Sequence, residues 1–200
     1  MRGFDVYAIV DPREHGAVAR TLRLIALGGP RLAVQLRAKG AGPEVHAAAL
    51  EALAPDAERC GAALFVSTHV ELAARAGVGV HLPEDAPELH AVRRLVPGPV
   101  GASCHDADGL RRRAGADFAV LGPIAEVPGK ASPLGWSAFR ALAEVAPMPV
   151  YALGGITSPD DVRAARDHGA RGVAALRALS GPDAEAVLTR WLAASGTMRP

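Results

Sequence analysis

A regular alternation of two kinds of segment constrains the fold of this chain more than any other feature of its sequence. Short apolar runs alternate with longer stretches rich in Ala, Leu and Arg. The runs are apolar at consecutive positions, which is typical of parallel strands that are covered on both faces. The predicted strands are 6–10, 32–36, 63–66, 78–82, 99–103, 118–122, 150–154 and 172–176. The predicted helices are 14–27, 44–59, 69–76, 86–95, 106–114, 136–146, 158–169 and 182–195.

The repeated unit predicts one α/β domain. Glycine-containing turns recur at 75–80, 113–118 and 167–173, where a glycine can end a helix before the next strand. No linker divides the chain, so we expect a single domain over 1–200, with a loose tail at 194–200. Eight βα units favour a (β/α)8 TIM barrel. An open doubly wound sheet is the alternative, because a count of units does not show closure.

Composition excludes several classes of protein. The formal net charge is +1 and the basic residues are scattered, which argues against a nucleic-acid partner. Cys60 and Cys104 have neither a zinc-binding nor a disulfide pattern. No apolar run approaches the ~18–20 residues that cross a bilayer, and the N-terminal run is too short for a signal peptide. We therefore expect a cytoplasmic protein with no membrane partner. Nothing in the sequence predicts its oligomeric state.

In a TIM barrel, chemistry belongs at the carboxyl ends of the strands, and the second strand ends in several polar residues. Gln35, Arg37 and Lys39 stand at alternate positions, which on an extended chain point to one side. A buried amide such as that of Gln35 must find partners, so packing alone explains it poorly. The alternative is a strand that leaves the core, with Arg37 and Lys39 solvated.

The fifth strand ends at Ser103, and Cys104 and His105 come next. This cluster raises the possibility of nucleophilic catalysis, but the chain has no GxSxG turn. We therefore do not favour Cys104 as a nucleophile.

Two further strand ends carry candidate phosphate-binding features. The long Pro- and Gly-rich connection after the sixth strand contains one cation, Lys130, and we expect it to be functional. Gly154 and Gly155 precede a helix, whose free N–H groups can bind an anion. Arg177, after the eighth strand, is predicted to help hold the same anion, where barrels often bind phosphate.

The order and spacing of several fragments resemble the thiamine phosphate synthase and thiazole tautomerase (TenI-like) superfamily of (β/α)8 barrels. They are VQLRAKG, GVHL, GASCH, GADFAVLGPI, KASPLG and PVYALGGIT. The resemblance implies thiamine biosynthesis: the synthase couples hydroxymethylpyrimidine diphosphate to thiazole phosphate and releases pyrophosphate. Small-molecule phosphates would then be the partners.

The resemblance also implies roles for individual residues. Gln35, Arg37 and Lys39 would contact the pyrimidine diphosphate, while Ser103 and Lys130 would hold the leaving pyrophosphate. Gly154 and Gly155 would cradle the thiazole phosphate. We thus predict as catalytic Arg37, Lys39, Ser103 and Lys130, and as further substrate-binding residues Gln35, His105, Gly154, Gly155 and Arg177.

The sequence departs from the synthase pattern at its magnesium site. The Asn-Asp pair of the synthase, followed by an arginine, reads Ser67, Thr68 and His69 here. Asp85, with Glu84 as an alternative, is the remaining acid after the fourth strand. Mg²⁺ prefers one or two carboxylates plus substrate phosphates, so we expect weak Mg²⁺ binding through Asp85.

The connection that carries Lys130 departs from the synthase pattern too. Val127 and Gly129 stand where the resemblance implies threonines. After the eighth strand, Arg177 stands where it implies a serine.

These departures leave two alternatives to a synthase. One is a tautomerase-like isomerase that kept the phosphate site, although the histidine of that branch is Pro123 here. His69, His81 or His105 would then carry the proton, or each is a structural histidine. The other alternative is a non-catalytic paralogue that binds thiamine precursors or regulates by interaction.

Overall fold

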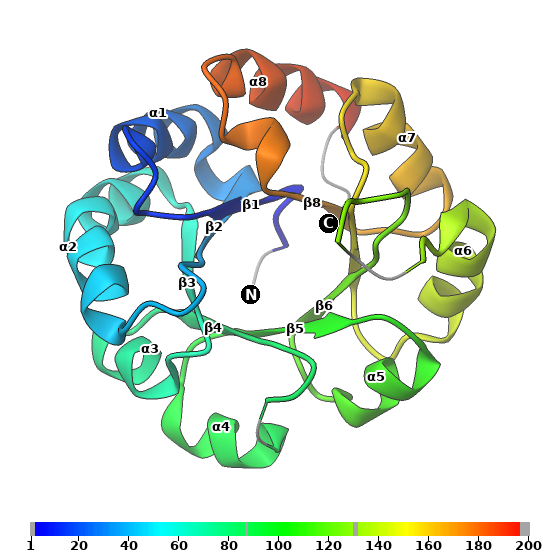
Figure 1. Ribbon diagram of the computed structural model, residues 1–200, viewed down its shortest axis with the longest axis horizontal. Helices are drawn as coiled ribbons and strands as arrows, with labels where there is room; N and C mark the ends of the chain where they lie inside the picture. The colour runs from blue at the N-terminus through cyan, green and yellow to red at the C-terminus, as the bar shows by residue number, and fades with distance from the viewer. Residues whose placement is uncertain (1–2, 87, 130–131, 197–200) are drawn as a thin grey trace.

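The chain folds into a closed barrel of eight parallel strands in sequence order, as seen in a computed structural model that describes residues 3–86, 88–129 and 132–196. Figure 1 views the barrel along its axis, with the helices as an outer ring. The strands are β1 Val6–Val10, β2 Leu32–Leu36, β3 Ala63–Ser67, β4 Gly79–Leu82, β5 Val100–Cys104, β6 Phe118–Leu121, β7 Val150–Leu153 and β8 Gly172–Ala175.

A helix follows each strand within the described residues. The α-helices are α1 Ala17–Gly28, α2 Pro43–Cys60, α3 Val70–Ala76, α4 Leu89–Leu95, α5 Ala107–Arg112, α6 Gly135–Val145, α7 Pro159–Asp167 and α8 Ala184–Ala194. Two short 3₁₀ helices, η1 Gly29–Arg31 and η2 Arg177–Leu179, were not predicted. No described helix is long and apolar enough to span a membrane.

Closure confirms the predicted TIM barrel. Val6 of β1 pairs with Leu32 on one side and with Val173 of β8 on the other, so the open sheet is wrong. The predicted and observed boundaries differ most where loop residues lead into a helix. The helix predicted from residue 14 begins at Ala17, after Gly16 in the left-handed region, and the helix predicted from residue 86 begins at Leu89.

Aromatic rings fill the inside of the barrel. The ring of Phe4 lies 4.5–6.2 Å, centroid to centroid, from four others. Glycines make room for them, because a Cβ at Gly79 would overlap the Phe65 ring and one at Gly101 would overlap the Phe118 ring. The rings belong to Phe4, Tyr7, Phe65, Phe118 and Tyr151.

The amino ends of the strands are tied together by a buried carboxylate. Asp5 is fully buried, and its Oδ2 accepts a 2.5 Å hydrogen bond from Nε of Arg31. Arg31 also donates to the backbone oxygen of Leu192 at 2.7 Å. Nη1 of Arg166 lies 3.8 Å from the other carboxylate oxygen of Asp5. This end of the barrel therefore joins β1, η1, α7 and α8.

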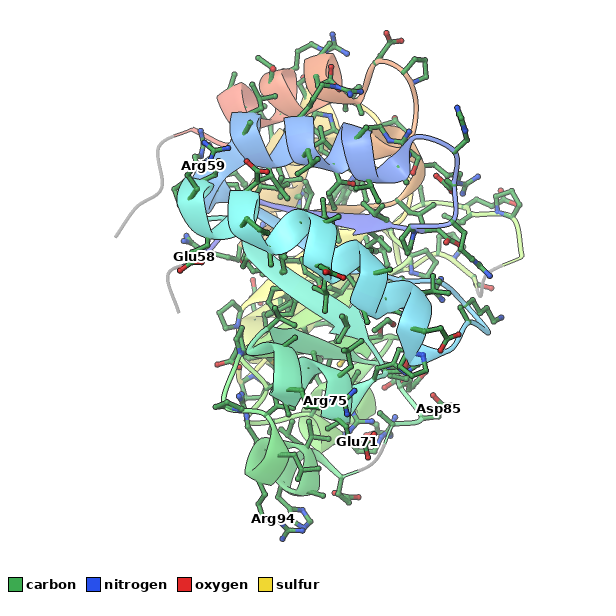
Figure 2. All side chains as sticks on the ribbon, turned by 90° about the vertical axis from the view of Figure 1, so that its left-hand side faces the viewer. Glu58, Arg59, Glu71, Arg75, Asp85 and Arg94 are labelled. Carbon is green, nitrogen blue, oxygen red and sulfur yellow. The ribbon has the colours of Figure 1, made fainter. Side chains whose placement is uncertain are left out.

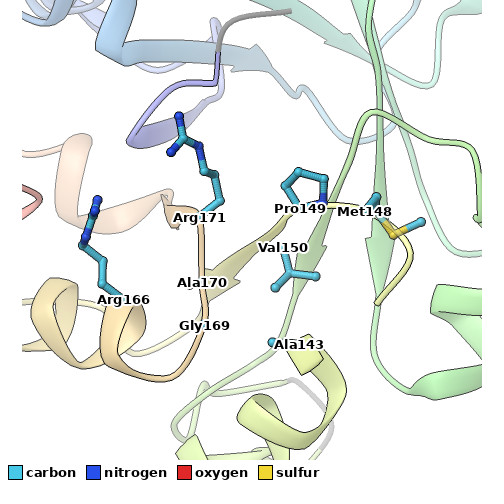
Figure 3. A pocket seen from close by; sticks show the side chains of 8 residues that line it. All are labelled: Ala143, Met148, Pro149, Val150, Arg166, Gly169, Ala170 and Arg171. Atoms are coloured by element: carbon cyan, nitrogen blue, oxygen red, sulfur yellow. The ribbon is translucent and has the colours of Figure 1, made fainter. Parts of the chain in front are cut away.

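A small pocket lies beside these ion pairs, at the start of β7 and β8. Its volume is about 290 Å³, and Figure 3 shows Arg166 and Arg171 on one side and Met148, Pro149 and Val150 on the other.

The start of the predicted tail is ordered against α8. The helix runs through Ala194, and the hydroxyl of the buried Ser195 donates to the backbone oxygen of Trp191. The remainder, 197–200, lies outside the described residues.

Replacing Asp5 by Asn should destabilise the fold by about 3 kcal/mol, because it leaves Arg31 and Arg166 without their buried counter-charge. Urea unfolding measures the change. Asp56→Asn is the matched control, since its pair with Arg59 is solvent-exposed and such pairs contribute roughly 0–1 kcal/mol. Equal effects of the two substitutions would contradict a special role for the buried pair.

Candidate active site at the carboxyl ends of the strands

Gln35 and Arg37 lie toward the carboxyl end of the barrel, and their side chains have no partner in the part of the chain that the structure describes. Gln35 lies in β2 between Ile9 and Phe65 and is 2% exposed. Within the described residues its amide makes no hydrogen bond, and its polar atoms are not completely shielded from solvent. Arg37 follows half-buried, and no ion pair of its guanidinium is found in the same part of the chain. Both groups are thus available to a ligand.

Lys39 lies further out than the alternation predicted. The strand ends at Leu36, and Lys39 is exposed in a turn. The backbone there is held by Arg13, which donates to the oxygen of Lys39 at 3.4 Å and pairs with Asp11 at 2.6 Å. The ammonium of Lys39 thus lies on a loop at the rim rather than inside the barrel.

His46 holds the same loop, and the sequence analysis missed it. Its Nε2 accepts the N–H of Ala38 at 3.2 Å, while Nδ1 donates to the oxygen of Gly42 at 3.1 Å. Burial lowers the pKa of His46, which keeps Nε2 free to accept. The ring also lies edge-on to His69, with centroids 4.5 Å apart. Nothing in the local sequence signals these contacts, since they depend on how the loop folds back onto α2.

Ser103 is linked to the core by a buried histidine. Nε2 of His81 lies 3.0 Å from Oγ of Ser103, and Nδ1 lies 3.1 Å from the hydroxyl of Tyr7. Burial, and to a lesser degree the charge of Arg37, lowers the pKa of His81 to about 3. His81 is therefore neutral and structural rather than a proton carrier at neutral pH.

The two residues after Ser103 play different parts. Cys104 is fully buried, and burial raises the pKa of its thiol to about 11, which agrees with the expectation that it is not a nucleophile. His105 is exposed at the rim. Its Nδ1 donates to the backbone oxygen of Gly122 at 2.5 Å, and its Nε2 lies 3.7 Å from Glu84. His105 thus bridges two of the loops that surround the site.

Gly154 and Gly155 are required by close packing. Both have positive φ, and a Cβ on either would overlap Pro123 or Ala125 of the loop after β6. No hydrogen bond from the N–H groups of Gly155 or Ile156 is found within the described residues. These two groups remain available to an anion.

The start of α7 differs from the anion cup that the sequence suggested. Asp161 accepts hydrogen bonds from the N–H groups of Thr157 and Ser158, and the Ser158 hydroxyl accepts that of Asp161. Three N–H groups at the start of this helix are therefore occupied by its own side chains, which leaves the glycine loop before it as the better source of free donors.

Of the two remaining predicted residues, Arg177 and Lys130, the structure describes only Arg177. Arg177 is exposed at the start of η2, directly after the last strand. Lys130 lies outside the described residues, so its position in the site stays a prediction.

The carboxylates at this end fit a magnesium ion poorly. No group of three or more His, Cys, Asp or Glu side chains that could hold a metal is found among the described residues. Glu84 is engaged by Arg112 at 3.3 Å. The Thr68 hydroxyl donates to the oxygen of Ser67 at 2.5 Å. Asp85, the acid that the sequence proposed for a metal, is exposed at the end of the barrel opposite Glu58 and Arg59, as Figure 2 shows.

A TIM barrel with an unpaired cation, a buried amide and free backbone N–H groups at the carboxyl ends of its strands is typical of enzymes that bind phosphorylated small molecules. The family described as "Thiamine monophosphate synthase" matches residues 6–179. The chain belongs to this family, which confirms the resemblance seen in its motifs.

Individual relatives agree with this assignment. A putative thiamine-phosphate synthase of Geobacter sulfurreducens is 34% identical over 88% of this chain and 86% of its own length. A thiamine-phosphate synthase of Thermus thermophilus is 35% identical, covering 90% and 91% respectively. The solved thiamine phosphate pyrophosphorylase from Pyrococcus furiosus has a TM-score of 0.83 at 23% identity, covering 96% of this chain and 95% of that one. This structural likeness supports the fold.

Thr68 should be a point of backbone strain. Its φ is +65°, a conformation that β-branched residues rarely adopt and that Asn tolerates better. We expect Thr68→Asn to stabilise the fold by about 1 kcal/mol in urea unfolding. Thr189→Asn, at an exposed position within α8, is the control and should change the free energy of unfolding by only a few tenths of a kcal/mol. A destabilised Thr68→Asn protein would contradict the strain.

The stability of the protein should fall in acid partly because of His81. Its pKa is about 3 in the folded state and near ~6.5 unfolded, so between these values the unfolded chain binds a proton that the folded chain excludes. This contribution is complete above pH ~6.5 and is lost as the pH falls toward 3. Between pH 7 and pH 4, the free energy of unfolding should therefore fall less for His81→Gln than for wild type. The exposed His15→Gln control should retain the wild-type slope.

Proposed function

We propose that this chain is a thiamine phosphate synthase, which joins hydroxymethylpyrimidine diphosphate to thiazole phosphate and releases pyrophosphate. The observation that carries the proposal is the buried amide of Gln35, which has no hydrogen-bond partner among the described residues, beside the half-buried Arg37. A buried amide without partners is costly, and a pyrimidine with ring nitrogens and an amino group would satisfy it. Family membership supports the same reaction, and the isomerase and non-catalytic alternatives are not favoured.

The proposed reaction begins with departure of the leaving group. The bond between the methylene carbon and the diphosphate oxygen breaks, and pyrophosphate leaves with the electron pair. Negative charge then grows on the leaving oxygens, where the guanidinium of Arg37 and the hydroxyl of Ser103 would stabilise it. Lys39 and Lys130 are proposed to add positive charge from the surrounding loops.

The second step joins the two rings. The lone pair of the thiazole nitrogen attacks the methylene carbon of the pyrimidine cation and forms the new C–N bond, so the positive charge passes to the ring of the thiazolium product. The contribution of the protein to this step is positioning, because the thiazole nitrogen must be held close to the methylene carbon and directed at it. The free N–H groups of Gly155 and Ile156 would hold the thiazole phosphate, with Arg177 and His105 at the rim.

The binding of Mg²⁺ and the cellular location of the protein remain predictions. Asp85 is the residue that would hold Mg²⁺, and the metal would neutralise charge on the pyrophosphate. Because one acid is a weak site, we propose a shallow dependence on Mg²⁺. A cytoplasmic location agrees with the described helices, none of which is long and apolar enough to span a membrane.

The test is to incubate the pure protein with both substrates, with and without Mg²⁺, and to measure thiamine phosphate. Arg37→Ala should lower kcat/KM about 100-fold or more, as loss of a group that stabilises developing charge does. Arg94→Ala, on the exposed end of α4 away from the site in Figure 2, should leave the rate unchanged. Absence of product from wild type, with thiazole phosphate still bound in calorimetry, would overturn the proposal.

A further inference from the structure

We propose that Tyr7 and His81 form a buried relay that fixes the Ser103 hydroxyl as a hydrogen-bond donor toward the ligand. Tyr7 is fully buried and His81 is 4% exposed, while Ser103 is partly exposed at the end of β5. The relay runs 3.1 Å from Tyr7 to Nδ1 and 3.0 Å from Nε2 to Ser103. That Ser103 meets an anion rests on the proposed function, whereas the direction of the relay does not.

The tyrosine sets the direction. Within the described residues, His81 is the one hydrogen-bonding partner of the Tyr7 hydroxyl. Burial raises the pKa of Tyr7 well above its usual value, so the hydroxyl keeps its proton. Surrounded by the rings of Phe4, Phe65 and Phe118, that proton can be satisfied only by Nδ1 of His81. Tyr7 is therefore the donor and Nδ1 the acceptor.

This choice determines the histidine tautomer. A neutral imidazole carries one proton, and if Nδ1 accepts, the proton is on Nε2. The low pKa of His81 excludes the doubly protonated ring near neutral pH. Arg37 is the charged group whose field acts on this ring, and it disfavours a second proton as well. Nε2–H thus donates to Oγ of Ser103.

The serine is oriented as a consequence. With one lone pair of Oγ occupied by Nε2–H, the hydroxyl proton points away from the core, toward the carboxyl end of the barrel where Gln35 and Arg37 also lie. A phosphate oxygen there would receive a charge-assisted hydrogen bond. The neutral relay adds no charge of its own, so it orients the donor without altering the field of Arg37.

Tyr7 disfavours the reverse direction, and that direction would also be unfavourable for an anion at Ser103 if one binds there as proposed. If Nδ1 donated to Tyr7, the hydroxyl proton of Tyr7 would be buried without an acceptor. Nε2 would then accept the proton of Ser103 and leave only lone pairs facing the anion. The two arrangements place protons on opposite nitrogens of one ring, so a measurement can separate them.

Nitrogen NMR of ¹⁵N-histidine-labelled protein is the direct test. The His81 signals are those lost in His81→Gln, and couplings to the carbon-bound ring protons distinguish Nδ1 from Nε2. We expect a protonated Nε2 and a bare Nδ1 in wild type. In Tyr7→Phe, the fraction of His81 that carries its proton on Nε2 should fall. The hydroxyl of Tyr151 donates to the oxygen of Phe4, so the Tyr151→Phe control should leave this fraction unchanged. A protonated Nδ1 in wild type would overturn the relay.

Binding of inorganic pyrophosphate, measured by calorimetry, tests the consequence for Ser103. Ser103→Ala should weaken binding about 10-fold or more, and Tyr7→Phe should weaken it in part. In the Ser103→Ala background, Tyr7→Phe should have no further effect, because the relay has nothing left to orient. An equal loss in both backgrounds would indicate a packing role and contradict the proposal. If wild type bound no pyrophosphate, the proposed function would fail, and the His81 tautomer would still decide the relay.

Discussion

The rings of Phe4, Tyr7, Phe65, Phe118 and Tyr151 fill the inside of the barrel, and the polar groups of the site are placed relative to them. The packing requires that small residues face large ones, which is why glycine stands at two inward positions opposite rings. The polar side chains of Gln35, His81 and Ser103 stand beside this cluster, in register with Phe65, Gly101 and Val120 of the neighbouring strands.

Tyr7 belongs to both parts of the molecule. Its ring packs in the aromatic cluster, and its hydroxyl reaches His81 and through it Ser103. A hydroxyl on a strand end would otherwise rotate freely. Anchoring it to the packed aromatic core prepares a donor before the ligand arrives, which lowers the cost of ordering on binding.

A half-buried cation, Arg37, and neutral hydrogen-bonding groups lie at the carboxyl end of the barrel. Arg37 lacks a carboxylate partner among the described residues, whereas Asp11 and Glu84 are occupied by Arg13 and Arg112. Such a surface favours phosphorylated ligands and offers little to a free cation. Thr68, where the family resemblance implies a metal-binding aspartate, contributes a hydroxyl that is already bonded to Ser67. Family membership therefore coexists with a set of described carboxylates that offers a metal no cluster of three or more ligands.

The sequence by itself determined the eight repeated units, the family and the strand ends that carry polar residues, because these follow from local periodicity and motif spacing. It did not reveal that Gly154 and Gly155 pack against the loop at 123–125, or that His46 holds the Lys39 loop. Only the tertiary structure decided that Tyr7, His81 and Ser103 form one chain. Tyr7 and His81 are 74 positions apart, and closing the barrel is what brings such strands within hydrogen-bonding distance.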